Sequence, residues 1–226
     1  MINLFCCFAN FMEFISKYWL FGLGFFAQGL FGLRLLIQLF LSEKAGKSVS
    51  PTIFWQISLL ASFLFLTYGV IREDAVIIIG QSLSYLIYIR NLQLKGAWQT
   101  LKWFVRLIIF ILPITAWLWI LNKPDSLQQA FSASNMLSFW AILGTCGMLM
   151  LNLRYLYQWY RSEKEKESVL PFGFWVISAV ASLIVVFYGY QKSDPVLIVS
   201  QGMGLVVYLR NCVLGLKDSS KQSKRN

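Results

Sequence analysis

Long apolar runs joined by short polar segments make up most of the chain. Five runs approach the roughly 20 residues that a helix needs to cross about 30 Å of hydrocarbon, at 19–41, 51–70, 103–121, 137–160 and 170–190. Two shorter runs lie at 75–89 and 195–209, and the side chains of Arg90 and Arg210 behind them can extend to the membrane surface. The pattern predicts seven transmembrane helices.

The polar residues of the stretch 34–93 return 120 positions further on. Compared without a gap, 34–93 and 154–213 are identical at 24 of 60 positions. An apolar composition alone would not keep polar residues in register over this distance, so the chain contains an internal duplication. Each copy holds three spans and the span 103–121 lies between them, which predicts an all-α integral membrane protein in a 3+1+3 order. We expect a first three-helix repeat at 19–93, a connector at 94–136, a second three-helix repeat at 137–214 and a basic cytoplasmic tail at 215–226.

Composition and charge agree with a membrane protein. The chain is 58% hydrophobic and only 13% charged, with a mean hydropathy of +0.61. With the N-terminus outside, fourteen Lys and Arg residues fall on the inner side and four on the outer side, which favours an inner C-terminus. The net charge of +10 therefore indicates topology and attraction to anionic membrane lipids, and we expect no nucleic-acid partner.

One charge lies within the first span of each copy. Arg34 and Gln38 are four residues apart and so share a helix face, and Arg154 and Gln158 repeat the pair. A charge inside a span usually faces the bundle interior or a polar cavity. The alternative is that each arginine extends to lipid phosphate at the inner surface. The repetition favours a paired internal role, in which the two arginines hold an anionic substrate.

The other spans of each copy carry polar stripes at helical spacing. In the second span, a proline is followed by a tryptophan and a serine on one face, which is either a helix-packing surface or a substrate-facing wall. In the third span, a glutamine, a tyrosine and an asparagine share a face. We take these residues with the arginine pairs as candidate substrate-binding residues: Arg34, Gln38, Trp55, Ser58, Gln81, Tyr88, Asn91, Arg154, Gln158, Trp175, Ser178, Gln201, Tyr208 and Asn211. Pro51 and Pro171 are expected to be structural, at the first turn of their spans.

Several kinds of chemistry have no support in the residues. Histidine is absent, the four cysteines have no metal-ligand spacing, and the acids lie in loops, termini or span edges. The chain carries no carboxylate pair and no nucleotide-binding glycine loop. From these residues alone we expect no metal, no cofactor, no catalytic residue and no enzymatic activity. The first 18 residues have neither a basic start nor a cleavage site, so we expect no removable signal peptide.

The repeated motifs resemble those of the lipid A biosynthesis N-terminal domain family. The matching residues are Arg34-x3-Gln38, Ser42-Glu43-Lys44, Ser48-x2-Pro51-x2-Phe54-Trp55, Asp74-x6-Gln81 and Tyr88-x-Arg90-Asn91, each with its counterpart 120 residues later. The family distantly resembles the PQ-loop and SWEET transporters, so the resemblance implies two three-helix units around a central path, in a bacterial inner membrane. The copies are not equivalent, because Gln28 corresponds to Met148 and Gly80 to Ser200.

Three functions follow from these observations as expectations. The favoured one is a transporter or flippase of an envelope precursor, an anionic lipid-linked or phosphorylated sugar, in lipid A or glycolipid biosynthesis. The second is a membrane scaffold that partners a glycosyltransferase. The third, an enzyme of lipid A disaccharide synthesis, is less favoured, since we expect no soluble glycosyltransferase domain within these 226 residues.

Overall fold

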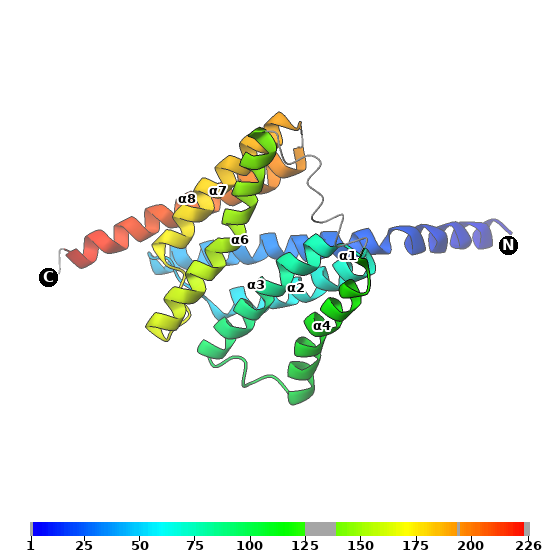
Figure 1. The fold of residues 1–226 in the computed structure, drawn as a ribbon, viewed down its shortest axis with the longest axis horizontal. Helices are drawn as coiled ribbons and strands as arrows, with labels where there is room; N and C mark the ends of the chain where they lie inside the picture. The colour runs from blue at the N-terminus through cyan, green and yellow to red at the C-terminus, as the bar shows by residue number, and fades with distance from the viewer. Residues whose placement is uncertain (1, 125–138, 194, 224–226) are drawn as a thin grey trace.

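The described part of the chain is all α-helical. The computed structural model describes residues 2–124, 139–193 and 195–223, and these form seven helices. They are α1 (Ile2–Ala45), α2 (Thr52–Ile71), α3 (Ala75–Leu94), α4 (Trp103–Leu121), α6 (Phe139–Glu165), α7 (Phe172–Gln191) and α8 (Pro195–Ser223) (Figure 1). Of the predicted segments, 125–136 in the connector, the first two residues of the span 137–160 and the end of the tail lie outside the described residues.

The helices pack as two groups that meet along two seams. In the first group α2 contacts both α1 and α3, and in the second group α7 contacts both α6 and α8. One seam joins α1 to α8 and the other joins α3 to α6. Helix α4 packs against α2 and α3, on the outside of the first group (Figure 1).

Five helices are long and apolar enough to cross a membrane. These candidate spans are Trp19–Ala45, Thr52–Ile71, Trp103–Leu121, Phe172–Gln191 and Leu197–Lys217. Among the described residues α3 and α6 do not reach that level, although 137–160 was predicted as one of the longer spans. The reason is their polar content: α3 carries Gln81, Arg90 and Asn91, and the second half of α6 is rich in charged and amide side chains.

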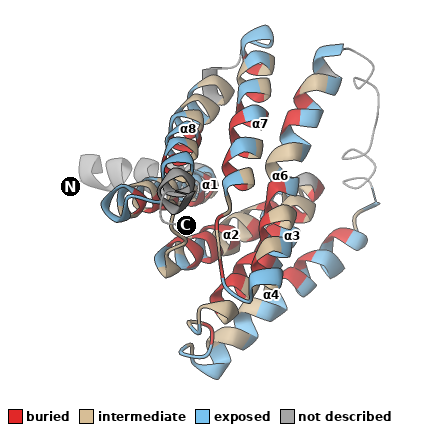
Figure 2. Cartoon of the chain, turned by 90° about the vertical axis from the view of Figure 1, so that its left-hand side faces the viewer, coloured by how far each residue is buried: buried red, intermediate tan, exposed pale blue. Residues whose placement is uncertain are grey.

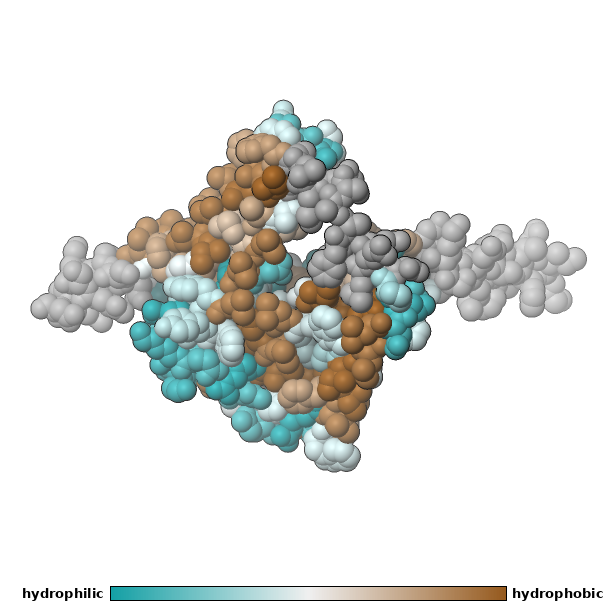
Figure 3. Space-filling view, viewed as in Figure 1, coloured by the Kyte–Doolittle hydropathy of each residue, from teal (hydrophilic) through white to brown (hydrophobic). Residues whose placement is uncertain are grey.

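The outer surface is that of a protein in contact with lipid. Large apolar side chains point outward, for example Phe25, Trp103 and Ile114, which are 76%, 72% and 58% exposed. Figure 2 shows the buried residues on the faces where helices meet. In Figure 3, hydrophobic residues cover the middle of the visible face, and hydrophilic residues gather at the lower left, where α3 and α6 end. The protein is therefore membrane-associated, as its composition predicts.

The two copies begin and end their helices in the same way. Pro51 and Pro171 are the residues just before α2 and α7, with extended backbones, so each lies one position ahead of the predicted first turn. Gly46 ends α1 in the left-handed conformation, with φ 68°, and the equivalent Lys166 ends α6 with φ 54°. A lysine in that conformation costs about 1 kcal/mol relative to glycine. The duplicated backbone geometry is thus kept even where the residue type has changed.

Candidate functional site

A cavity of about 390 Å³ lies between the two helix groups. Its wall is built by α1, α3, α6 and α8, the four helices that form the seams. Six of the predicted substrate-binding residues line it: Arg34, Gln81, Tyr88, Arg154, Gln201 and Tyr208. The wall also contains Gln28, Ser84, Asn152, Tyr155 and Ser200, which were not among the predicted substrate-binding residues.

Arg34 is held in the cavity wall by three hydroxyl groups. Its Nη1 donates to Ser58 Oγ at 2.7 Å and to Tyr88 Oη at 3.0 Å, and its Nη2 donates to Tyr155 Oη at 2.8 Å. The guanidinium carbon also lies 4.6 Å from the centroid of the Phe31 ring. Only 6% of the residue is exposed, so the side chain lies within the bundle and does not extend to the lipid surface.

Arg154 is equally buried, and two of its nitrogens lack a hydrogen-bond partner where Arg34 has one such nitrogen. It is 7% exposed, and its Nε and Nη1 have no hydrogen-bond partner among the described residues. Its guanidinium carbon lies 5.0 Å from the Tyr208 ring centroid and 5.1 Å from the Tyr155 ring centroid. Aromatic faces stabilise a cation, but they do not replace the hydrogen bonds that a buried guanidinium loses.

The cavity therefore has a positive wall. The guanidinium carbons of Arg34 and Arg154 lie 5.8 Å and 5.1 Å from the same ring centroid, that of Tyr155, so they are at most about 11 Å apart. Neither arginine forms an ion pair with a described Asp or Glu, and no acid lines the cavity. Two unit charges about 10 Å apart repel by roughly 1–2 kcal/mol at an effective dielectric constant of 20. An anion between them would remove this repulsion and supply hydrogen-bond acceptors.

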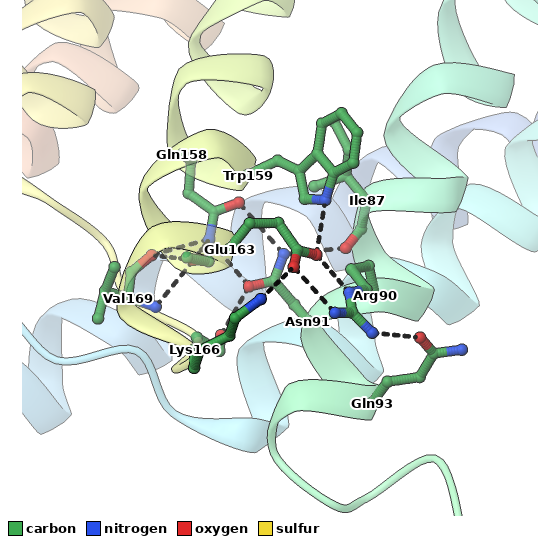
Figure 4. Close-up of polar contacts among 11 residues, drawn as sticks. Ile87, Arg90, Asn91, Gln93, Gln158, Trp159, Glu163, Lys166 and Val169 are labelled. Carbon is green, nitrogen blue, oxygen red and sulfur yellow. Dashed lines mark hydrogen bonds and ion pairs between the residues drawn. The ribbon is translucent and has the colours of Figure 1, made fainter.

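A layer of paired amides lies one helical turn beyond the arginines. Gln38 Nε2 donates to Asn211 Oδ1 at 2.9 Å and Asn211 Nδ2 donates back to Gln38 Oε1 at 3.1 Å. Asn91 and Gln158 make the same reciprocal pair across the other seam, at 2.8 and 3.1 Å (Figure 4). All four residues were predicted to bind substrate. The structure places them outside the cavity wall, fully buried and bonded to one another.

Two ion pairs form a further layer at the same end. Arg90 donates from Nε and Nη2 to the carboxylate of Glu163 (Figure 4), and Arg210 pairs in the same way with Glu43. The hydrogen bonds from Arg90 lower the pKa of Glu163 to about 2. The Ser-Glu-Lys and Tyr-x-Arg-Asn motifs therefore tie each helix group to the other at the end of the molecule where α1, α3 and α6 finish, which we call the basic end.

The remaining predicted residues lie in the core. Trp55 and Trp175 are fully buried, and Trp175 Nε1 donates to Ser48 Oγ across the two groups at 2.7 Å. Ser58 Oγ and Ser178 Oγ donate to the carbonyls of Phe54 and Phe174, and Ser58 Oγ also accepts a hydrogen bond from Arg34. These residues contact the site from behind and do not line the cavity.

Tyr155 was not predicted as a site residue, although its ring centroid lies 5.8 Å and 5.1 Å from the guanidinium carbons of Arg34 and Arg154. The repeat could have drawn attention to it, because position 155 is a tyrosine and the equivalent position 35 is a leucine. Among the described residues no group of three His, Cys, Asp or Glu side chains is placed to hold a metal ion. The polar groups of the cavity are arginine, amide and hydroxyl groups, which suit an oxyanion bearing hydroxyl groups.

The chain is similar in sequence to one protein family and to several named proteins. The family model described as Lipid A Biosynthesis N-terminal domain matches residues 23–93 and 143–213. The chain is 29% identical over 216 residues to a protein of Chlamydia muridarum named lipid-A-disaccharide synthase, with 89% of this chain and 35% of that protein covered. Proteins of the same name from Chlamydia felis and Chlamydia trachomatis are 28% and 26% identical, over 88% and 92% of this chain and 34% and 36% of their own length. No solved structure matches.

These names contradict the expectation that the chain has no enzymatic activity. Relatives that match nearly the whole chain are named for an enzyme. The expectation was drawn only from the residue types within this chain, and the chain spans about a third of the length of those relatives. The residue types in a segment that matches one third of these relatives are not sufficient to exclude the enzymatic activity for which the relatives are named.

Proposed function

Because the chain belongs to the lipid A biosynthesis N-terminal domain family, we propose that it binds and moves an anionic lipid-linked or phosphorylated sugar used in lipid A synthesis. The observation that carries this proposal is the pair of buried arginines on one cavity wall with no described acid to neutralise them. A buried charge left alone costs at least about 2.5 kcal/mol even on the lenient membrane-insertion scale. An anionic ligand offsets that cost.

The proposal gives the fold a transport arrangement. The first group (α1–α3) and the second group (α6–α8) act as two like three-helix units joined by α4 in a 3+1+3 order, as in the PQ-loop and SWEET transporters. The cavity at their seams is the path. The neutral polar residues of its wall, Gln28, Gln81 and Gln201, hydrogen-bond the sugar hydroxyl groups. The membrane is the bacterial inner membrane, with the end of the molecule that carries the ion pairs on the cytoplasmic side.

The proposed binding of an anionic ligand is tested with two compounds that differ only in a phosphate group. The protein is reconstituted in nanodiscs of neutral phosphatidylcholine and titrated with N-hexadecanoylglucosamine 1-phosphate and with N-hexadecanoylglucosamine. We expect the phosphorylated compound to bind at least about 10-fold more tightly, and the double variant Arg34→Gln, Arg154→Gln to lose the difference. Equal affinity of both compounds for the native protein would refute the anionic ligand.

Transport itself is measured in proteoliposomes with a fluorescent derivative of the same phosphorylated compound. We expect the native protein to move the labelled compound between leaflets. In vesicles with the double arginine variant, the label should move no faster than in vesicles without protein. Orientation is tested by single cysteines at Lys47, Lys166 and Lys192 in a cysteine-free background. We expect positions 47 and 166 to be labelled from the same side of the membrane and position 192 from the opposite side. Labelling of positions 47 and 166 from opposite sides would refute the two like units.

A second function is favoured by the names of the relatives. Their match over nearly all of this chain supports a direct part in lipid-A-disaccharide synthesis, in which the cavity delivers the sugar substrate to the site of glycosyl transfer. The test is sugar transfer by the reconstituted chain, alone and mixed with a soluble lipid-A-disaccharide synthase. Product formed by the chain alone assigns it the reaction itself, and a rate increase only in the mixture assigns it substrate delivery to a partner glycosyltransferase.

A further inference from the structure

The two arginines of the cavity differ in their free hydrogen-bonding capacity. Arg34 donates to three hydroxyl groups at 2.7 to 3.0 Å, and only one of its nitrogens, Nε, has no hydrogen-bond partner. Arg154 is 93% buried, lines the same cavity, and has unpaired groups at both Nε and Nη1. A ligand anion therefore gains more hydrogen bonds at Arg154 than at Arg34, because Arg34 already uses its terminal nitrogens.

One substitution between the copies accounts for part of the difference, because Ser178 and Tyr208 repeat the other two partners of Arg34, Ser58 and Tyr88, without a change of residue type. The hydroxyl that reaches Arg34 from the opposite helix group belongs to Tyr155. The equivalent position in the first copy is Leu35, which also lines the cavity but has no hydrogen-bonding group to offer Arg154. The repeat symmetry would supply each arginine with a hydroxyl from across the seam. The leucine leaves that place empty on one side only.

We propose that the anionic group of the ligand binds at Arg154, and that the Leu35–Tyr155 difference orients the ligand in an otherwise pseudo-symmetric cavity. The inference rests on the proposed function, since it assigns the anion of that same ligand to one of the two arginines. The ligand group is a phosphate or another oxyanion with at least two acceptor oxygens. Its neutral part then extends toward Arg34, whose charge is already shared with tyrosine and serine hydroxyls.

The proposal predicts unequal effects for equivalent substitutions. In neutral nanodiscs, Arg154→Gln should weaken binding of N-hexadecanoylglucosamine 1-phosphate by about 10- to 100-fold, whereas Arg34→Gln should weaken it by no more than about 3-fold. Arg154→Lys keeps the charge but loses the planar arrangement of donors, so an intermediate loss is expected. Each variant is checked for native thermal unfolding, and Arg154→Lys replaces Arg154→Gln if the latter does not fold.

Substitutions at the equivalent positions 35 and 155 give a sharper test. Leu35→Tyr should supply the missing hydroxyl to Arg154 and weaken ligand binding about 10-fold, with both arginines present. Tyr155→Phe removes the hydroxyl from Arg34 with little change in shape, so it should create a second anion site, seen as two phosphates bound per protein when inorganic phosphate is titrated. Native binding by Leu35→Tyr would overturn the inference.

The outcomes separate this inference from the proposed function. Equal losses for Arg34→Gln and Arg154→Gln would overturn the orientation but leave an anionic ligand in the cavity. No loss for either variant would remove the anionic ligand and the proposed function with it. Competition distinguishes the sources of the anion: displacement by inorganic phosphate indicates recognition of the phosphate group itself, and displacement only by phosphatidic acid indicates a membrane lipid headgroup at Arg154.

Discussion

The amide pair between Asn91 and Gln158 offers a direct test of how the two helix groups are held together. Asn91 is fully buried on α3 and makes four hydrogen bonds. Its Oδ1 accepts from Gln158 Nε2 at 2.8 Å and from Ser168 Oγ at 2.7 Å, and its Nδ2 donates to Gln158 Oε1 at 3.1 Å and to the Ile87 carbonyl at 2.9 Å. The change Asn91→Ala removes all four.

The loss of stability expected for Asn91→Ala depends on which hydrogen-bonding groups remain without a partner. Gln158 Nε2 keeps Ser162 Oγ and the Val169 carbonyl, and Ser168 keeps its contact with Ser50, but Gln158 Oε1 loses the Asn91 amide as its donor inside the bundle. A buried acceptor left alone costs about 1–3 kcal/mol and the lost bonds add a further fraction, so we expect a loss of about 2–3 kcal/mol in the free energy of unfolding. Removing both partners should cost less than the sum of the single changes, with a coupling of about 1–2 kcal/mol.

Asn211 provides the matched control within the chain. It makes the same reciprocal pair with Gln38 but has no counterpart of the Ser168 bond, so Asn211→Ala should cost about 1 kcal/mol less than Asn91→Ala. Unfolding is followed by circular dichroism in mixed dodecyl maltoside and dodecyl sulfate micelles. If Asn91→Ala unfolds within about 0.5 kcal/mol of the native protein, or if the pair shows no coupling, the amide layer does not hold the groups together.

Two further predictions concern the ion pairs and the close helix packing. Arg90 lowers the pKa of Glu163 to about 2, below its ordinary value of 4.5, so the pair stabilises the fold above about pH 4.5 and this is lost as the pH falls toward 2. Glu163→Gln should therefore cost at most about 1 kcal/mol at pH 7 and flatten the acid limb of a stability profile, and an unchanged limb would contradict the pairing. A methyl group on Gly147 would lie 2.8 Å from Val185 Cγ2. A methyl group on Gly29 would have no atom within 4 Å apart from its chain neighbours and its own helix backbone. We expect Gly147→Ala to lower the thermal midpoint and Gly29→Ala to raise it through the better helix propensity of alanine, and the reverse order would refute the packing.

Helix positions could be predicted from the sequence because the apolar runs are long and the repeat supplies each boundary twice. The span 51–70 became Thr52–Ile71 and the span 103–121 became Trp103–Leu121. Local signals set these ends: Pro51 precedes α2, and the Asp74 side chain caps α3 by accepting from the backbone N–H of Ile77 at 3.1 Å. The helix ends at 94 and 165 extend past the apolar runs, because polar residues continue a helix without continuing a hydrophobic pattern.

The partners of the polar residues could not be predicted in the same way. Helical spacing placed Arg34 and Gln38 on one face, but it does not tell that the first lines a cavity while the second is bonded to Asn211, 173 residues away. Side chains one turn apart on α1 meet different parts of the opposite group, and only the packing of the two copies decides which. A motif that repeats within the chain therefore indicates a shared position in the fold, and it does not by itself distinguish a ligand contact from a contact between the copies.

The order of these layers constrains how a ligand can leave the cavity. Among the described residues, the side-chain hydrogen bonds that join the two groups lie at Arg34 or nearer the basic end. They are the bond from Arg34 to Tyr155, the two amide pairs, the two ion pairs, and the serine and tryptophan contacts of the 48–50 and 168–175 segments. Release toward that end would break these contacts together, because all of them cross the same two seams. Since each buried bond that is broken leaves polar groups unpaired, we expect such a step to be cooperative and to be favoured when water or a partner protein supplies the lost hydrogen bonds. A partner that binds the basic end would thus act on the same contacts that join the two helix groups.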